Sequence, residues 1–351
     1  MSGASTSRLR PVGRAILRRL PLLGTLVGIG LAIWLVATND LAAVAAAFGK
    51  IGVLGFAGVT LVRAIIVLLC GLAWARILDG LSPAPTIAFL ILRFVREGIN
   101  VLLPVASVGG DVLGARLLTF WGVAGALAAA SILADMLLQV GTLALFAGLG
   151  AGLLTRVEGA AAADLAHWTL RALAIAGLLL AAFFALQRTG IAHRLEARVV
   201  ALGRRFVRET EARPDPAPRV QGALDAVWGP GRRGHLAESL ALHALAWLLG
   251  AAEIAIVLAC IGVDVGLSEV LVIEAMGQAI KAVAFLIPSG LGVQEGGLVL
   301  VCGLFGIDAG TALALSLAKR VPDVVLGLPA LLVWQNLEAR RAGVQPGPAP
   351  R

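Results

Sequence analysis

Two proline and glycine segments interrupt the apolar pattern of this chain and restrict the folds open to it. They are residues 104–111 (PVASVGGD) and 288–297 (PSGLGVQEGG), and an apolar stretch precedes each one. Irregular backbone at membrane depth leaves amide and carbonyl groups unpaired, which costs several kcal/mol per group in hydrocarbon. Such a segment is tolerated only where protein or a water-filled cavity satisfies it. In a membrane protein, the two breaks therefore indicate a site.

The composition predicts a membrane protein built of helices. Of the 351 residues, 59% are hydrophobic and 14% are charged, and the mean hydropathy is +0.93. A soluble core of this length does not need so much apolar surface. The apolar runs are also too long for the strands of a membrane barrel. We therefore expect an all-α, polytopic integral membrane protein.

The net charge of +8 does not indicate a nucleic-acid partner. The arginines gather at the ends of apolar segments and in one central loop, as expected for residues that set membrane topology. The three cysteines, Cys70, Cys260 and Cys302, lie within apolar stretches and lack the spacing of metal ligands. We interpret them as small buried hydrophobic residues. We expect no disulfide, metal or other cofactor.

About six segments can cross the membrane, and two more form hairpins. A full span has to cross about 30 Å of hydrocarbon at about 1.5 Å per residue. The segments that we interpret as full spans are residues 22–38, 51–77, 123–154, 169–187, 236–262 and 308–334. Two further apolar segments, 86–103 and 268–287, end at the proline breaks and are followed by the short segments 112–122 and 298–306. We interpret each pair as a re-entrant helical hairpin.

Basic residues predict which parts of the chain are cytoplasmic. The first twenty residues carry five arginines and no acid, residues 188–234 carry ten arginines against five acids, and the last arginines lie at 340, 341 and 351. Residues 155–168 carry one arginine against two acids and should be external. These assignments agree when each hairpin returns to its own side. We expect the inner (cytoplasmic) membrane of a bacterium, with both termini cytoplasmic.

The resulting topology is an inverted repeat. Residues 1–20 form a basic N-terminus, residues 21–157 a first membrane repeat with its hairpin at 85–120, residues 158–337 a second repeat with a cytoplasmic loop at 188–234 and a hairpin at 268–306, and residues 338–351 a tail. One hairpin enters from the cytoplasm and the other from outside. Secondary transporters place a site at the midplane in this way, where broken helices of the two halves meet.

Charged residues at membrane depth fall on three helical faces. The first hairpin presents Arg93, Arg96, Glu97 and Asn100 at spacings of three and four, the second presents Glu274, Gln278 and Lys281, and the last span presents Ser316, Lys319, Arg320 and Asp323. An ionisable group inside a span costs about 3 kcal/mol or more unless it faces a partner or water. These faces should look inward. The alternative is that Arg96 with Glu97, or Arg320 with Asp323, only lock helices together as ion pairs.

The turns after the prolines could hold an anionic head group. Their backbone amides are free of side-chain bulk, and lysine and arginine lie nearby. Asp111 and Glu295 would pair with the arginines when the site is empty, or carry protons. The glycines are equally explained by close packing or left-handed backbone. Arg63, Asp135, Glu253 and His243 are isolated in their spans, so each is as readily a packing partner as a functional group.

The break motifs resemble those of the flippase-like transmembrane family, which includes the membrane region of the lysylphosphatidylglycerol synthases. The motifs are residues 100–116, from NVLLP through VGGDV to GAR, and residues 288–296 (PSGLGVQEG). The resemblance extends over residues 15–337 and is closest to the hopanoid-biosynthesis-associated membrane proteins of Gram-negative bacteria. It implies lipid transport, with hopanoids or anionic or aminoacylated phospholipids as cargo and hopanoid-biosynthesis proteins as candidate partners. Only a short tail follows Glu338, so we expect no synthase activity and no enzyme.

Three functions remain open from the sequence: a lipid flippase or transporter, which we favour, a non-catalytic scaffold of a hopanoid-biosynthesis complex, and a membrane-embedded lipid transferase. The candidate substrate-binding residues are Arg93, Arg96, Glu97, Asn100, Gly109, Gly110, Asp111, Arg116, Glu274, Gln278, Lys281, Gly292, Gln294, Glu295, Gly296, Lys319, Arg320 and Asp323, with Pro104 and Pro288 as the helix breaks.

Overall fold

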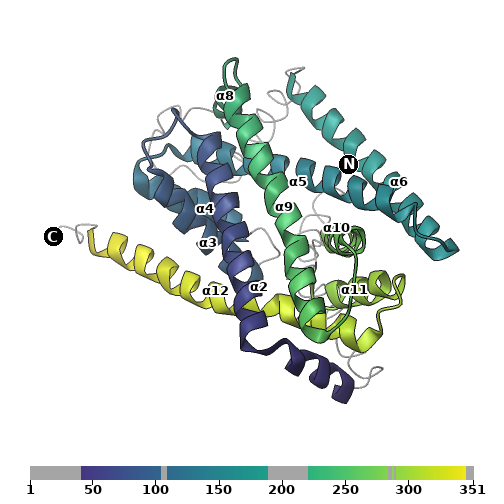
Figure 1. Ribbon diagram of the computed structural model, residues 1–351. Helices are drawn as coiled ribbons and strands as arrows, with labels where there is room; N and C mark the ends of the chain where they lie inside the picture. Colours follow the sequence, from purple (N-terminus) through teal and green to yellow (C-terminus); the bar gives the residue numbers. More distant parts are fainter. Residues whose placement is uncertain (1–40, 104–108, 189–219, 284–286, 288–289, 345–351) are drawn as a thin grey trace, which may run out of the picture.

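The computed structural model describes residues 41–103, 109–188, 220–283, 287 and 290–344, and every regular element within these ranges is a helix (Figure 1). The helices are α2 (Leu41–Ile77), α3 (Thr86–Leu102), α4 (Gly109–Leu118), the short 3-10 helix η1 (Thr119–Trp121), α5 (Gly125–Leu154), α6 (Ala160–Arg188), α8 (Val220–Val227), α9 (Arg233–Ile261), α10 (Leu267–Val283), α11 (Val293–Gly303) and α12 (Ala309–Val344). The predicted all-α fold is confirmed for these ranges. The predicted span 22–38 and both break prolines lie outside the described residues.

Three of the described helices, α2, α5 and α9, are long and apolar enough to cross a membrane. The shortest of them, α9, has 29 residues and measures about 44 Å, against about 30 Å of hydrocarbon. The predicted spans 169–187 and 308–334 fall in α6 and α12, which are not in this group. Helix α12 contains two internal prolines, Pro322 and Pro329, beside its charged face. The count of six spans, the re-entrant hairpins and the inverted repeat therefore stay predictions.

Helix α2 bends sharply near its start, at the lower end of the long dark helix in Figure 1. Gly52 has φ 64° and ψ 174°, a backbone conformation that interrupts the helix and that residues with a side chain rarely adopt. The straight part that follows the bend corresponds to the predicted span 51–77. The bend therefore separates the first part of α2, which precedes the expected span, from the straight part.

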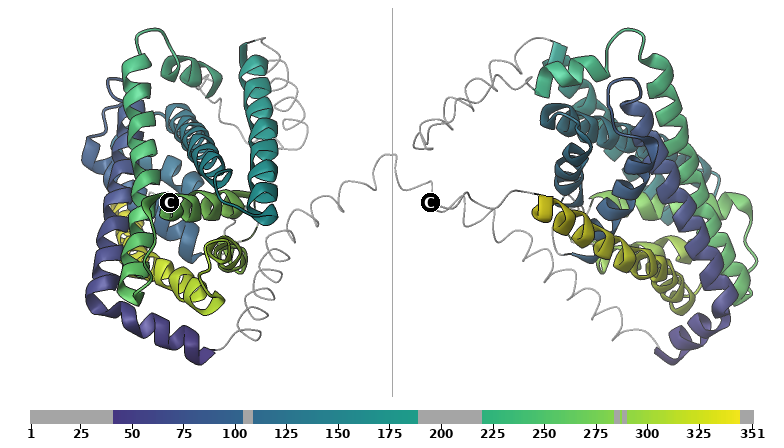
Figure 2. Two further views of the ribbon diagram at one scale, coloured as in Figure 1. Left: turned by 45° about the vertical axis from the view of Figure 1, so that its right-hand side comes forward. Right: turned by 90° about the vertical axis from the view of Figure 1, so that its left-hand side faces the viewer.

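Helices α2 and α9 run side by side along one face of the molecule, and α12 crosses near the foot of this pair (Figure 2). Small residues allow the close approach of α2 and α9. A Cβ atom on Gly55 would lie 3.0 Å from Sγ of Cys260, and one on Gly58 would lie 3.6 Å from Cγ2 of Ile256. The pair forms a support against which α3, α5, α10 and α12 pack.

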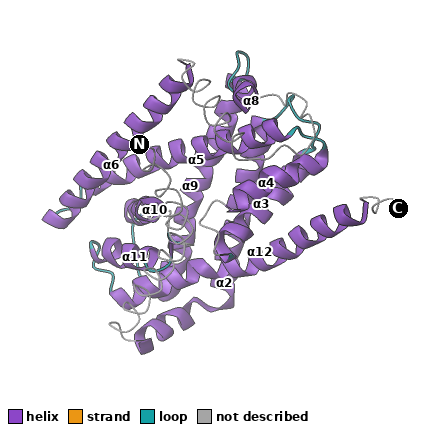
Figure 3. Ribbon diagram, turned by 180° about the vertical axis from the view of Figure 1, so that it is seen from behind, coloured by secondary structure: helices purple, strands orange, loops and turns teal. Residues whose placement is uncertain are grey.

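The two hairpin pairs, α3 with α4 and α10 with α11, lie on either side of this support (Figure 3). Each first arm crosses the long helix of the other half, so that α3 contacts α12 and α10 contacts α5. A Cβ atom on Gly98 of α3 would lie 3.0 Å from the carbonyl oxygen of Gly327 on α12. On the other side, a Cβ atom on Gly150 of α5 would lie 2.5 Å from Cβ of Ala275. The glycines thus allow the two helices of each crossing to pack closely.

Buried apolar residues form two large clusters with a polar layer between them. On α2 the first cluster reaches Val59 and the second begins at Trp74. On α5 the order is reversed, because the second cluster ends at Leu138 and the first begins at Phe146. Arg63 lies between these limits on α2, and Asp135 lies one turn before Leu138 on α5. The long helices therefore pass from one apolar core to the other through a charged middle layer.

Candidate functional site

A polar cavity of about 370 Å³ lies in this middle layer, between α2, α3, α5, α9 and α10. Its charged lining residues are Arg63, Arg93, Glu97, His243, Glu253, Glu274 and Lys281, and its polar lining includes Gln139 and Gln278. Gly290, from the second helix break, also lines it. Most of the charged groups are held in place by ion pairs with the surrounding helices.

The first hairpin is closed by Arg96 and Asp111. Arg96 is 1% exposed, and its Nη2 and Nε donate to Oδ1 of Asp111 at 2.5 Å and 3.0 Å. The backbone N–H of Gly110 donates to Oδ1 of Asn100 at 2.8 Å, while Nδ2 of Asn100 donates to Oδ2 of Asp111 at 3.3 Å. A Cβ atom on Gly110 would lie 2.2 Å from the carbonyl oxygen of Arg96. The glycine of the break is therefore required for the two arms to meet.

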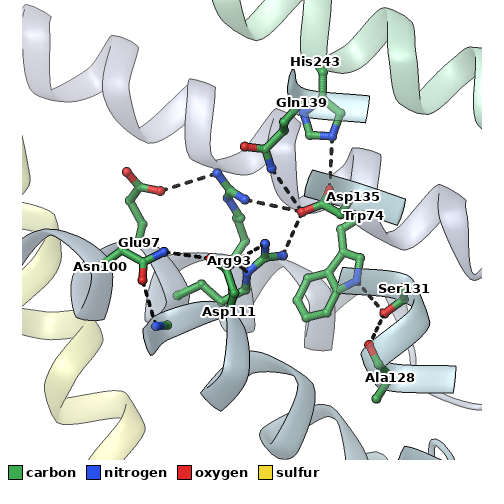
Figure 4. A network of polar contacts seen from close by, with 12 residues as sticks. Trp74, Arg93, Glu97, Asn100, Asp111, Ala128, Ser131, Asp135, Gln139 and His243 are labelled. Carbon is green, nitrogen blue, oxygen red and sulfur yellow. Dashed lines mark hydrogen bonds and ion pairs between the residues drawn. The ribbon is translucent and has the colours of Figure 1, made fainter. Parts of the chain in front are cut away.

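Asp135 of α5 is the centre of the polar network on this side of the cavity (Figure 4). Its Oδ2 accepts a hydrogen bond from Nε2 of Gln139 at 3.1 Å and forms ion pairs with Nη1 of Arg96 at 2.9 Å and Nη1 of Arg93 at 3.5 Å. Its Oδ1 lies 3.1 Å from Nε2 of His243 on α9. Asp135 has no exposed surface, so its charge is balanced by these neighbours and not by water.

The ring of Trp74 packs against the guanidinium of Arg96. The Arg96 Cζ atom lies 4.6 Å from the ring centroid of Trp74, a cation–π arrangement. The Trp74 Nε1–H donates to Oγ of Ser131 at 3.0 Å, and Ser131 Oγ–H donates to the carbonyl oxygen of Ala128 at 2.8 Å. These bonds fix the ring and, through it, the direction of Arg96.

The second hairpin meets α12 through Glu274 and Lys319. The Lys319 ammonium lies 2.6 Å from Oε2 of Glu274 and 3.1 Å from Oε2 of Glu253 on α9. Nε2 of Gln278 donates to the other oxygen of Glu274 at 2.8 Å. A Cβ atom on Gly250 would lie 2.5 Å from this carboxylate. The absence of a side chain at Gly250 therefore leaves room for Glu274 beside α9.

Arg63 links the two halves of the chain. Its Nε and Nη2 each donate to an oxygen of Glu253 at 2.7 Å, which is a bidentate pair. Its Nη1 also lies 3.6 Å from Oδ1 of Asp323 on α12. Arg63 belongs to α2, whereas both carboxylates come from helices in the second half of the chain. The ion pairs thus connect Arg63 with residues 190 and 260 positions later in the sequence.

Glu295 organises the start of α11 outside the cavity lining. Its Oε2 accepts the N–H of Gly292 at 2.7 Å, and its Oε1 accepts Nε of Arg320 at 2.7 Å. Gly292 has φ 75°, a left-handed conformation suited to glycine. Nε2 of Gln294 donates to Ser316 of α12 at 3.3 Å. This carboxylate therefore caps the helix that follows the break and joins it to α12.

An apolar groove of about 470 Å³ adjoins the polar cavity, between α5, α6 and α10. It is lined by side chains such as Val140, Leu173 and Val283. Leu143 and Ala282 line both the groove and the polar cavity, so the two spaces meet at these residues. Val283 is 78% exposed. The groove is therefore open to the outside of the helix bundle.

Comparison with known proteins now gives the chain a family. Its sequence matches the family described as the lysylphosphatidylglycerol synthase TM region over residues 22–330. The chain belongs to this family. The match covers most of the chain and confirms the resemblance based on the two break motifs. No curated protein matches the chain.

Membership of the lysylphosphatidylglycerol synthase TM region family also supports the predicted membrane class. The description of the family names the membrane region of a lipid synthase and so indicates a membrane protein related to lipid, and the three apolar helices agree with it. The link to hopanoid biosynthesis, the inner membrane and the cytoplasmic placement of both termini stay predictions.

In this family member, the structure brings part of the predicted site together. Five predicted residues line the cavity: Arg93, Glu97, Glu274, Gln278 and Lys281. Lys319 and Asp323 form ion pairs with cavity-lining residues. Arg96 pairs with both Asp111 and Asp135, and Asp135 in turn pairs with the lining residue Arg93. Asn100 and Gly110 hold the first break, and Gly292, Gln294, Glu295 and Arg320 hold the second. Gly109 begins α4, and Gly296 lies in the first turn of α11.

Arg116 lies apart from the rest of the predicted site. Its guanidinium is exposed and pairs with Glu338 of α12 at 2.9 Å. It does not line the cavity. The motif that carries the family resemblance includes this residue, but a place in a motif does not give its direction on the helix.

The proposed structural pairs of Arg96 with Glu97 and of Arg320 with Asp323 are replaced by others. Arg96 pairs with Asp111 and Asp135, and adjacent residues such as Arg96 and Glu97 point about 100° apart on a helix. Arg320 pairs with Glu295 instead, and Asp323 lies near Arg63. The expectation that Asp111 and Glu295 pair with arginines agrees with the structure.

Four residues with isolated positions in the sequence are central to the network: Arg63, Asp135, Glu253 and His243. Helical spacing could not reveal these pairs, because it reports only neighbours on the same helix. One signal was present, since Gln139 lies four residues after Asp135 and donates to it. That polar face on α5 would have marked Asp135 as more than an isolated charge.

Proposed function

We propose that this protein is a lipid flippase or transporter that binds the head group of its cargo in the polar cavity and an apolar chain in the adjoining groove. The observation that carries this proposal is the junction of the two spaces at Leu143 and Ala282. An amphiphilic molecule matches such a pair of sites, because its polar end needs hydrogen-bonding partners and its tail needs apolar contact.

Two cations are suited to bind the head group. Lys281 lines the cavity and forms no ion pair among the described residues, with the stem of its side chain resting near Gly290. Arg93 lines the cavity too, and its buried Nε has no hydrogen-bond partner in the described part of the chain. Lysine and arginine donate charge-assisted hydrogen bonds to phosphate or carboxylate groups. A polar head group would complete the bonding of both.

The groove opens toward the surface of the bundle that would face the membrane. Its residues Val140, Trp168 and Val283 are well exposed at the bundle surface, where lipid chains would surround a membrane protein. A lipid could therefore keep its tail in the bilayer while its head group crosses through protein. This separation lowers the main barrier to lipid movement, which is the transfer of a polar head group through hydrocarbon.

The proposed cargo is a hopanoid or an anionic or aminoacylated phospholipid of the bacterial inner membrane. The family description and the cation pair Arg93 and Lys281 support a lipid with a polar head group. The proposed membrane arrangement has cytoplasmic termini and two re-entrant hairpins in opposite orientations. The matched crossings of α3 with α12 and of α5 with α10 support this repeat. The proposed role is transport and not enzymatic chemistry.

Reconstitution tests the proposal. Purified protein would be placed in vesicles of phosphatidylethanolamine and phosphatidylglycerol that contain a fluorescently labelled phosphatidylglycerol or a labelled hopanoid. Loss of fluorescence to an impermeant quencher then reports movement between leaflets. We expect Lys281→Gln and Arg93→Gln to slow this movement by about tenfold, because a charge-assisted hydrogen bond contributes about 1.5–3 kcal/mol.

Matched controls use exposed residues of the same types. Lys50→Gln and Arg340→Gln remove charges at exposed positions of α2 and α12 outside the cavity lining, and should leave the rate within about twofold of wild type. Movement of both probes no faster than in protein-free vesicles would contradict the proposal. Equal slowing by the control variants would contradict the assigned head-group contacts.

A further inference from the structure

His243 is a buried histidine in the wall of the cavity, and the head-group contacts above do not use it. It comes from the middle of α9 and is 1% exposed as a whole residue, yet its side chain lines the cavity. Nε2 of the ring lies 3.1 Å from Oδ1 of Asp135. The other oxygen of Asp135 forms ion pairs with Arg96 and Arg93 and accepts a hydrogen bond from Gln139. The ring is therefore the group that faces Oδ1.

The titratable groups around His243 come from three helices. Asp135 belongs to α5, Cys70 of α2 lines the same cavity as the ring, and Arg93 of α3 forms an ion pair with the carboxylate that the ring faces. Lys319 of α12 pairs with Glu274 of α10 and with Glu253 of α9. Glu253 lies ten residues from His243, or about 15 Å along the helix. Asp135 is therefore the carboxylate that acts directly on the ring.

Charge balance gives a second, independent observation. We define the cavity network as the charged residues that line the cavity together with those joined to them through ion pairs. Within the described residues, its carboxylates are Glu97, Asp111, Asp135, Glu253, Glu274 and Asp323, and its lysines and arginines are Arg63, Arg93, Arg96, Lys281 and Lys319. Six carboxylates thus face five lysine and arginine side chains.

The network carries one net negative charge when every carboxylate is ionised and His243 is neutral. An uncompensated charge at membrane depth costs several kcal/mol. One proton removes this imbalance, and histidine is the side chain whose charge ordinarily changes near neutral pH. A ring that touches both an acidic oxygen and the cavity can receive this proton from cavity water and return it by the same route.

We infer that His243 and Asp135 form a proton-binding site of the cavity, and that the proton held there couples lipid movement to the pH difference across the membrane. The coupling rests on the proposed transport function, whereas the proton site itself does not. On binding, the proton joins the ring nitrogen that does not face Asp135, and Nε2–H donates to Oδ1. No other bond is made or broken.

The proton site can be measured without any cargo. The full chain, labelled with ¹⁵N-histidine in phosphatidylcholine nanodiscs, would be titrated by NMR from about pH 5 to about pH 9, and the His243→Gln variant would assign the signal of His243. We expect a protonated ring at neutral pH that loses its proton at higher pH than His235, which lies on the same helix at 3.6 Å from Asp79. In Asp135→Asn the ring should lose its proton at lower pH.

A His243 ring that is neutral throughout this range overturns the proton site. If Asp135→Asn does not fold, the comparison of His243 with His235 in the wild-type protein decides the question, because loss of the proton at the same or lower pH than His235 also overturns it.

The coupling is tested in the vesicle assay with an imposed pH gradient. We expect the gradient to change the wild-type rate of lipid movement by about threefold or more, to change the His235→Gln rate equally, and to have no effect on the rate in His243→Gln. A gradient response retained in His243→Gln overturns the coupling. If the wild-type protein moves no lipid, the proposed function fails, and the coupling with it, while the titration still decides the proton site.

Discussion

Asp135 of α5 and Lys319 of α12 hold corresponding positions in the two halves of the chain, and their charges are opposite. Each lies 24 residues after the acidic residue of its helix break, Asp111 or Glu295. Each pairs with the first arm of the neighbouring hairpin and with α9. The basic arm α3 therefore meets an acid, and the acidic arm α10 meets a base. This exchange of sign keeps both buried pairs attractive.

The pair of Glu274 and Lys319 should show strong energetic coupling. Removing one partner of a buried ion pair costs about 3–5 kcal/mol, because the other charge is left without its partner. We expect Glu274→Gln and Lys319→Met each to lower the thermal stability of the detergent-purified protein markedly. The double variant should be less destabilised than the sum of the two, with a coupling energy of about 2 kcal/mol or more.

An exposed pair serves as the control for this cycle. Arg116 and Glu338 lie 2.9 Å apart near the bundle surface, and exposed ion pairs contribute about 0–1 kcal/mol. The cycle of Arg116→Gln and Glu338→Gln should therefore give a coupling energy below about 1 kcal/mol. Equal coupling in the two cycles would show that the middle-layer pair is no more important than a surface contact.

Gly110 should not tolerate even a methyl group. A Cβ atom there would lie 2.2 Å from a backbone oxygen, so the two arms of the first hairpin would have to separate and the bonds of Asn100 and Asp111 would be lost. We expect Gly110→Ala to destabilise the protein by about 3 kcal/mol or more. Thermal unfolding in detergent measures this change.

The matched control for Gly110 is Gly125, at the start of α5, where an added Cβ has no atom within 4 Å. Gly125→Ala should leave stability unchanged or raise it by up to about 1 kcal/mol, because alanine favours the helix. A stable Gly110→Ala variant would show that the hairpin closes in some other way.

The sequence predicted the helical class and the polar faces but not how those faces combine. The predicted arms 86–103 and 268–287 agree closely with α3 and with the start of α10, because apolar runs and proline breaks are local signals. The face from Arg93 to Asn100 was also visible, since helical spacing determines it. In contrast, Glu253 lies 190 residues from its partner Arg63, and His243 lies 108 residues from its partner Asp135. One sequence holds no record of such contacts.

The crossing of α3 and α12 gives a prediction that concerns packing alone. A Cβ atom on Gly98 would lie 3.0 Å from both the carbonyl oxygen of Gly327 and Cβ of Ala330. Gly98→Ala therefore requires the two helices to move apart by a few tenths of an ångström, at a cost of about 1–3 kcal/mol. Gly141→Ala, where an added Cβ meets nothing within 4 Å, should not be destabilised. Equal unfolding temperatures for the two variants would contradict a tight crossing.

Ala282 provides the most direct test of the passage between cavity and groove. It lines both spaces and is exposed, so a larger side chain there fills the junction without disturbing a buried core. We expect Ala282→Trp to reduce lipid movement in the vesicle assay by about tenfold or more while the unfolding temperature stays near that of wild type, since indole fills space that a lipid would occupy. Leu178→Trp is the matched control, because Leu178 is exposed on α6 outside the groove lining. Wild-type rates in Ala282→Trp would show that lipid does not pass between these two spaces.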